Sequence, residues 1–99
     1  MKLRPDKEES RRIRVAIRHV LLGTWDPIGI RDEPLAQDEY DMYIGDVYEL
    51  LIGDAPDEKI AEYLLWVSTE RMGFTRSERA ISVTAETVRE LRRIQLSSA

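Results

Sequence analysis

Carboxylates are the side chains most able to do chemistry in this chain, and several of them surround an aromatic connector at residues 24–37. A carboxyl group that is buried beside another can have its pKa raised enough to act as a general acid or base. No spacing selects a pair among the candidates, which are Asp26, Asp32, Glu33, Asp38 and Asp41. We therefore predict no catalytic residue, and a carboxylate-based enzyme at residues 25–41 is kept as an alternative.

Other site chemistries lack the residues that they need. His19 is the only histidine and there is no cysteine, so a zinc site would have to combine one imidazole with carboxylates. The acidic run at residues 38–41 lacks the alternating ligands and central glycine of a calcium loop, and the chain has neither a phosphate-binding glycine loop nor a nucleophile elbow. The sequence predicts no metal site, no cofactor and no enzyme activity.

Length and composition indicate one helical domain over residues 1–99. A chain of 99 residues, of which 42% are hydrophobic and 34% charged, can bury one core but not two. The absence of cysteine is typical of a reducing compartment, so we expect the cytoplasm. The apolar runs are too short for a signal peptide or a membrane span, so we expect no membrane partner.

The net charge of −4 conceals an acidic middle segment. Residues 24–62 carry two Lys or Arg against twelve Asp or Glu, whereas residues 1–23 carry seven against three. Within the basic segment, Arg11, Arg14 and Arg18 form a cationic stripe at helical spacing. Pairing of this stripe with the chain's own carboxylates is the simpler expectation, and nucleic acid is not expected as a partner because the chain is acidic overall.

The elements that position these side chains are predicted to be helices throughout. Apolar residues at helical spacing predict an all-α fold, a small bundle of three long helices plus a C-terminal helix. The helices are expected at about residues 7–22, 38–52, 56–72 and 76–96, and the ends at 1–6 and 97–99 are expected to fray.

Capping residues set the expected helix ends. Asp6 is the expected N-cap of the first helix, and the first three helices are expected to end at Gly23, Gly53 and Gly73. The last helix has a match to a capping box that starts at Thr75. Its β-branched residues lower helix propensity, which leaves a break near residue 82 open.

The apolar positions of each predicted helix define the side that faces the core. These positions are Ile13, Ala16, Ile17, Val20 and Leu21, then Tyr40, Tyr43, Ile44, Val47, Leu50 and Leu51, and in the last helix Ile81, Ala85, Val88 and Leu91. The third helix differs because it is apolar on two sides, with Leu64 on one, Leu65 on the other and Trp66 between them. Such a helix lies centrally, which we favour, or forms a homodimer interface.

The connector is expected to be pinned to the core by its own side chains. Ile30 and Leu35 are available for this packing, and Asp26 before Pro27 favours a turn in which the carboxylate accepts backbone N–H groups. The complete set of expected anchors is Trp25, Asp26, Pro27, Ile28, Gly29 and Tyr40. We interpret these residues as structural.

The second predicted helix carries an acidic side with a tyrosine at its edge. Tyrosine supplies rigid apolar area with a hydroxyl, and carboxylates steer association with a basic protein. The candidate partner-binding residues are Asp38, Asp41, Asp46, Tyr48 and Glu49. A solvated surface without a partner is the competing interpretation.

The chain resembles a family of small all-helical bacterial proteins of about this length. The resemblance covers roughly residues 13–73 and rests on the segments Trp-Asp-Pro-Ile-Gly at 25–29, Asp-Glu-Tyr-Asp at 38–41 and Tyr-Glu-Leu-Leu at 48–51, with Ala-Glu-Tyr-Leu at 61–64 and Glu-Arg-Met-Gly at 70–73. It implies an all-helical fold, and it carries over no catalytic assignment, because no activity is established for the family.

Immunity proteins of the colicin type are similar in style only, being small acidic helical proteins that cap a basic nuclease. Their aspartate-tyrosine-tyrosine-proline stretch is absent here. We predict a non-catalytic cytoplasmic protein that binds an unknown protein partner, for which a basic protein is one candidate. An immunity-type inhibitor of a basic toxin or nuclease is the alternative.

Overall fold

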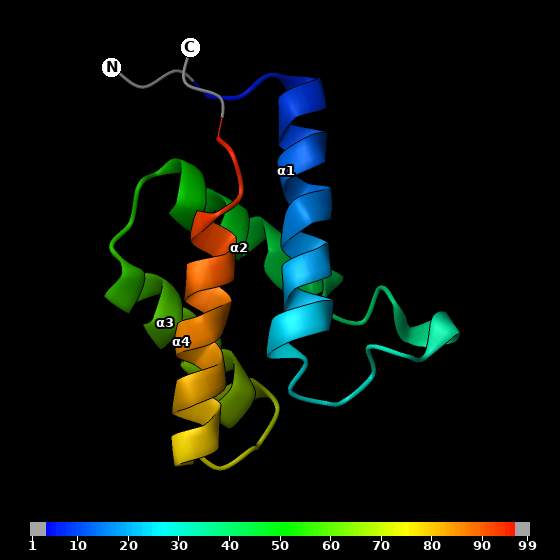
Figure 1. Ribbon diagram of the computed structural model, residues 1–99, viewed down its shortest axis with the longest axis vertical. Coiled ribbons are helices and arrows are strands. Elements are labelled where there is room, and N and C mark those ends of the chain that lie inside the picture. The colour runs from blue at the N-terminus through cyan, green and yellow to red at the C-terminus, as the bar shows by residue number, and fades with distance from the viewer. Residues whose placement is uncertain (1–3, 97–99) are drawn as a thin grey trace.

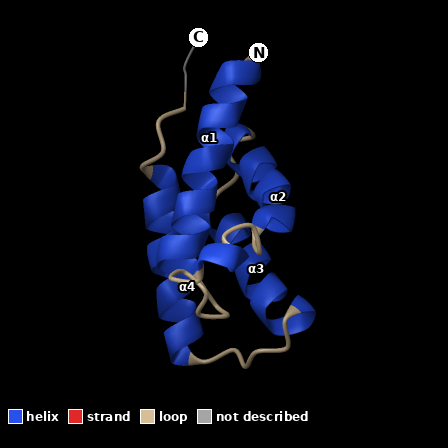
Figure 2. Ribbon diagram, turned by 90° about the vertical axis from the view of Figure 1, so that its right-hand side faces the viewer, coloured by secondary structure: helices blue, strands red, loops and turns tan. Residues whose placement is uncertain are grey.

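Residues 4–96, which the computed structural model describes, form helices that begin and end near the signals in the sequence. The α-helices are α1 (Lys7–Val20), α2 (Asp41–Ile52), α3 (Asp57–Trp66) and α4 (Glu78–Arg92), as Figure 1 shows. Two π-helical turns, η1 (Leu21–Trp25) and η3 (Val67–Arg71), extend α1 and α3, and a short 3₁₀ turn, η2, covers Pro34–Ala36. The described residues contain no strand, which confirms the all-α prediction (Figure 2).

The first helix starts where predicted but ends later. The Asp6 carboxylate accepts a hydrogen bond from the backbone N–H of Glu9 at 2.8 Å, as an N-cap does. The predicted end at Gly23 is wrong, since the chain continues through η1 and turns only at Asp26, whose φ is 33°. Continuing buries Leu22 and Trp25, and this burial outweighs the cost of about 1 kcal/mol for a glycine inside a helix.

The second and third helices keep their predicted C-terminal ends. Gly53 follows α2, and Gly73, with a φ of 79°, follows η3 in the left-handed conformation that glycine accommodates easily. Helix α2 begins later than the predicted start at residue 38. Residues 37–40 form turns instead, and Tyr40 is only 1% exposed.

The last helix is one continuous helix that starts at a different cap. The hydroxyl of Ser77, not of Thr75, accepts the hydrogen bond from the backbone N–H of Ala80 at 3.0 Å. No break occurs near residue 82. The β-branched Thr87 fits inside the helix because its hydroxyl donates to the carbonyl of Val83 at 2.8 Å.

The side of α4 that faces the core is also corrected. Val88 and Leu91 are buried as predicted, but Ile81 and Ala85 are exposed. Thr84 and Thr87 take their place, being 2% and 0% exposed. A threonine can bury its methyl group while its hydroxyl bonds locally, so apolar periodicity alone places this face incorrectly.

The two candidate caps of α4 can be distinguished by substitution. Ser77→Ala is expected to lower the free energy of unfolding by about 1 kcal/mol, because the N–H of Ala80 loses its acceptor. Thr75→Ala is the matched control and should change stability by less than about 0.5 kcal/mol. Urea unfolding followed by circular dichroism measures both, and equal losses would show that Ser77 is not the cap.

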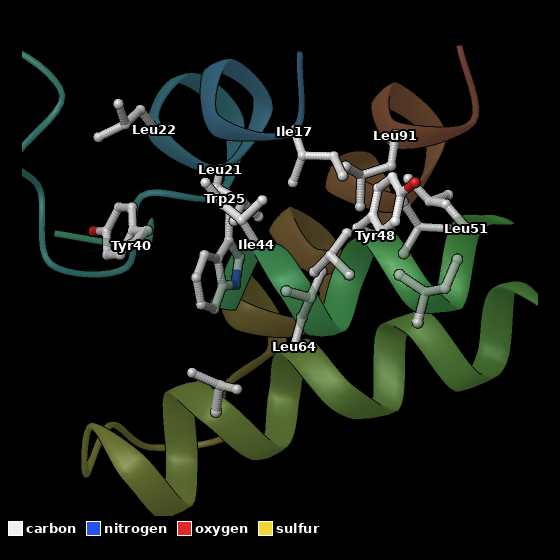
Figure 3. Close-up of a cluster of buried hydrophobic side chains, with 14 of the residues drawn as sticks. Ile17, Leu21, Leu22, Trp25, Tyr40, Ile44, Tyr48, Leu51, Leu64 and Leu91 are labelled. Carbon is white, nitrogen blue, oxygen red and sulfur yellow. The ribbon is translucent and has the colours of Figure 1, made fainter. Parts of the chain in front are cut away.

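The core lies where α1, α2, α3 and α4 meet. Figure 3 shows Ile17, Ile44, Tyr48, Leu64 and Leu91 converging from these four helices. The predicted side is confirmed for Ile13 and Ile17 on α1 and for Leu21 at the start of η1, each 0% exposed. Helix α1 packs against α2 and α4, and α4 packs against α3 and η1.

Helix α3 does not have the central position that its two apolar sides suggested. It packs against α4 and α2, with Leu64 in the core. Trp66, between its two apolar sides, is 47% exposed, whereas Leu65 on the second side is 8% exposed. The exposed apolar part of α3 is therefore at Trp66, beside the largely covered Leu65.

Residues 4–6, which precede α1, are held by hydrogen bonds, in contrast to the fraying that was expected over 1–6. Arg4 donates to both carboxylate oxygens of Glu49, with Nη2 at 2.9 Å from Oε2. Fraying of residues 1–3 and 97–99 concerns positions outside the described residues. Across residues 4–96, no helix combines the length and the apolar character needed to cross a bilayer.

Candidate functional site

Asp26 organises the connector that the sequence singled out. Its carboxylate accepts hydrogen bonds from the backbone N–H groups of Ile30 at 2.8 Å and Arg31 at 3.2 Å. The hydroxyl of Tyr40 and Nε of Arg31 also donate to it, at 2.9 and 3.1 Å. The Asp26 side chain is only 2% exposed, so this carboxylate is fully engaged inside the protein.

The electrostatics of Asp26 are the opposite of what acid or base catalysis needs. Burial by itself raises the pKa of Asp26, but the bonds from Ile30, Tyr40 and Arg31 outweigh it and leave the pKa lowered. Burial, with the neighbouring Asp26, raises the pKa of Tyr40. The carboxylate thus stays ionised and the phenol stays neutral at physiological pH, which suits a structural pair and gives the enzyme alternative no support here.

The other connector carboxylates do not join Asp26. Asp32, Glu33 and Asp38 are exposed, and Asp41 pairs with Arg18. Among residues 4–96, no three Asp, Glu or His side chains are gathered as metal ligands would be.

Two aromatic residues hold the connector against the helices. Trp25 is 4% exposed, and its ring lies 5.3 Å from that of Tyr40 and 6.2 Å from that of Tyr43, measured between centroids. The hydroxyl of Tyr40 accepts from the backbone N–H of Ile28 at 2.9 Å. Tyr40 therefore fixes both ends of the turn.

The remaining expected anchors have mixed surroundings. Pro27 and Ile30 are half-buried, whereas Ile28 is 46% exposed and Gly29 is exposed with a φ of 77°. The expectation that Leu35 packs on the core is wrong, because its side chain is 98% exposed. It lies on η2, which projects to the side of the helices in Figure 1.

The predicted partner-binding surface on α2 is largely used within the chain. Tyr48 is 2% exposed, and the guanidinium of Arg14 lies 4.3 Å from its ring centroid, so its assignment to a partner surface is corrected. The side of α2 at Tyr48 faces the core, where the ring joins the cluster in Figure 3. A buried ring cannot be offered to a partner without unfolding this region.

The α2 carboxylates have partners as well. Asp41 is bound by Arg18, with Nε at 2.9 Å from Oδ1, and Asp46 accepts from the hydroxyl of Tyr63 at 2.7 Å. Glu49 is bound by Arg4. Of the predicted carboxylates only that of Asp38 is exposed with no side-chain hydrogen bond or ion pair to the described residues. The basic N-terminal segment thus neutralises part of the acidic block, but of the stripe Arg11, Arg14 and Arg18 only Arg18 pairs with a carboxylate among the described residues.

A groove on the outer side of α3 is the acidic surface that sequence reasoning missed. Its volume is about 740 Å³, and we call it the α3 groove; it is lined by Glu58, Ala61, Glu62, Leu65, Trp66, Thr69, Glu70 and Arg76. Glu58, Glu62, Trp66 and Glu70 follow one another at intervals of four, so they form one ridge of the helix. This interval of four residues is visible in the sequence and could have indicated the groove, because it places Trp66 on the same ridge as three glutamates.

The charges of the α3 groove are not neutralised by the described chain. Glu58, Glu62 and Glu70 form no ion pair or hydrogen bond through their side chains within residues 4–96. The guanidinium of Arg71 lies 5.9 Å from the Trp66 ring centroid, and Arg76 lines one end. The groove therefore combines an exposed indole with net negative charge.

Comparison with known proteins gives no indication of function, so the proposal below is based on the geometry of the α3 groove. A scan against protein-family models, a search of curated proteins and a search of solved structures each returned no match to the chain. The family resemblance at residues 25–29 and 38–41 stays a prediction.

Proposed function

We propose that the protein is a non-catalytic interaction protein that binds a basic, amphipathic helical segment of a partner in the α3 groove. The observation that carries the proposal is Trp66, 47% exposed on a ridge between unpaired glutamates. The absence of cysteine supports a reducing compartment such as the cytoplasm as the place of action.

The composition of the groove suits this class of partner. Exposed tryptophan is enriched among the residues that dominate binding energy, because it buries a large rigid surface at low entropic cost. Leu65 is 8% exposed and Ala61 is half-buried beside it, so a partner's apolar residues would meet a shallow floor next to the indole. Helices dock in such grooves through residues three and four positions apart, which matches the ridge of α3.

Charge favours a basic partner over a second copy of this chain. A two-fold homodimer through α3 would bring Glu58, Glu62 and Glu70 near their own copies, and like charges at an interface cost several kcal/mol. A basic segment would instead pair with them. This keeps the partner chemistry of the immunity-type alternative but moves the surface from α2 to α3, and the same negative charge would repel nucleic acid.

Direct titration tests the α3 groove. The probe is a synthetic amphipathic helical peptide of lysine and leucine, with a scrambled peptide of equal charge as its control, and calorimetry measures Kd. Trp66→Ala is expected to weaken binding by about 30-fold, the effect of losing a central hot spot. The double variant Glu62→Lys with Glu70→Lys should weaken binding at least as much.

The control variant carries Asp32→Lys and Glu33→Lys, which change the net charge equally on the exposed connector. It should bind nearly as well as the wild type. Equal loss in both double variants would reduce the effect to net charge and contradict a site on α3. A wild-type dimer in sedimentation that Trp66→Ala dissociates would assign the groove to a second copy instead.

A further inference from the structure

A second hollow, separate from the α3 groove, lies between the connector and the start of α4. Its volume is about 600 Å³, and we call it the arginine cleft. One wall is formed by Trp25 to Gly29 with Arg31, and the other by Ser68, the 74–77 linker and α4 as far as Thr84. This volume lies within the range of pockets that bind small organic molecules.

The charged groups of the arginine cleft favour an anion. Arg31 and Arg79 line it from opposite walls. Among the described residues that line it, Asp26 alone is negatively charged. Its carboxylate already accepts hydrogen bonds from Ile30, Tyr40 and Arg31. Arg31 uses Nε on Asp26, whereas Arg79 has no ion pair or side-chain hydrogen bond with residues 4–96. Donors of both guanidinium groups are therefore available to a ligand.

Thr84 provides a buried polar group with no protein partner. It is 2% exposed and lines the cleft, and its hydroxyl has no hydrogen bond to residues 4–96. Every side-chain oxygen or nitrogen that is sealed from solvent in this part of the chain has a hydrogen-bond partner, so the Thr84 hydroxyl keeps some exposure, and Thr84 is one of the residues that line the cleft. Thr87, one turn further on, instead donates to the carbonyl of Val83. A hydroxyl left free at this depth is a ready donor to a ligand.

The backbone and the apolar walls complete the site. The positive end of the 15-residue helix α4 lies at the cleft; Ser77 accepts from the backbone N–H groups of Ala80 and Ile81, and those of Glu78 and Arg79 have no acceptor within the helix. Trp25 is buried in one wall, and Phe74, 44% exposed, lies at the other. An anionic head would meet the arginines and the helix start, while a flat apolar body would lie against the aromatic rings.

We propose that the arginine cleft binds a small organic anion, with one carboxylate or phosphate head and an apolar or aromatic body. The site shares no lining residue with the α3 groove. It therefore stands or falls independently of the interaction function proposed for α3.

Titration of the full chain followed by NMR amide shifts and Trp25 fluorescence in a Trp66→Phe background tests this site. The probes are phenyl phosphate, benzoate, inorganic phosphate and uncharged benzyl alcohol. The phosphate and carboxylate arms identify the preferred head group, and both aromatic anions should bind more tightly than benzyl alcohol or inorganic phosphate. Shifts should centre on Arg31, residues 77–80 and Thr84.

Two variants and one control locate the binding. Arg79→Gln should raise Kd about tenfold, and Thr84→Val, which keeps the shape of the side chain, should raise it several-fold. Arg89→Gln, on the exposed side of the same helix, is the matched control and should leave Kd unchanged. Equal affinity for benzyl alcohol and the aromatic anions, equal Kd in the Arg79 and Arg89 variants, or no saturable shift at millimolar probe would overturn the proposal.

Discussion

Trp25→Ala is expected to lower the free energy of unfolding by about 3–5 kcal/mol, the typical cost of deleting a buried aromatic ring. The ring is 4% exposed and contacts the rings of Tyr40 and Tyr43, so its loss leaves a cavity between the connector and α2. A domain of this size has only about 5–15 kcal/mol of stability in total. The variant is therefore expected to unfold at much lower denaturant.

Urea unfolding followed by far-ultraviolet circular dichroism measures this loss. Trp66→Ala removes the same side chain from an exposed position and should cost less than about 1 kcal/mol. Trp25→Phe should fall between the wild type and Trp25→Ala, because it retains part of the ring packing. Similar losses for Trp25→Ala and Trp66→Ala would contradict the role of Trp25 as the main anchor of the connector.

Helix content was predictable because its signals are local. The cap at Asp6 and the ends at Gly53 and Gly73 act within one turn of the chain, and the structure has each of them. Gly23 failed as an end because burial of Leu22 and Trp25 beyond it depends on tertiary packing. A local signal such as glycine ends a helix only where the residues that follow are not buried by continuing it.

The candidate sites were less predictable because neutralisation of charge is not local. Glu49 meets Arg4 across 45 positions, and Asp41 meets Arg18 across 23. The spacing of residues within the acidic helix does not indicate that Arg4 and Arg18 will pair with its carboxylates. The ridge from Glu58 to Glu70 could be predicted from helical spacing. Whether its glutamates form ion pairs could not, because that depends on how the other elements pack.

The two hollows have opposite charge because different residues line them. In the arginine cleft, the carboxylate of Asp26 is engaged by hydrogen bonds within its own turn, and Arg31 lines the cleft. On α3, Glu58, Glu62 and Glu70 form no ion pair with the described residues, although Arg76 lines one end of the groove. Opposite charges on separate surfaces permit two ligands of different chemistry.

Asp26→Asn is expected to lower the free energy of unfolding by about 1–3 kcal/mol at neutral pH, because buried donors lose a charged acceptor. The backbone N–H of Ile30 and the hydroxyl of Tyr40 both donate to the same carboxylate oxygen of Asp26. Asparagine is the informative replacement since it keeps the shape of the side chain and tolerates the φ of 33° at this position. The matched control Asp38→Asn, on the exposed surface, should change stability by less than about 0.5 kcal/mol.

The difference between the wild type and Asp26→Asn should depend on pH. The pKa of Asp26 in the folded protein is lowered below the unfolded value of about 3.9. The folded state therefore stabilises the ionised carboxylate more than the unfolded state does. The stabilisation is complete above that unfolded pKa and is lost as pH falls through the folded pKa. Urea unfolding of both proteins at about pH 7 and about pH 3 should therefore give a smaller difference at the acid value.

Comparing the two proteins isolates Asp26, because carboxylates such as Glu49, whose pKa is also lowered by Arg4, titrate in both. Tyr40→Phe sharpens the test by removing one donor to Asp26 while keeping the ring. Its loss should raise the folded pKa of Asp26 toward the ordinary value, so the acid-dependent loss of stability begins at higher pH. A difference between wild type and Asp26→Asn that is constant from neutral to acid pH would show that the carboxylate contributes its shape to the turn and not its charge.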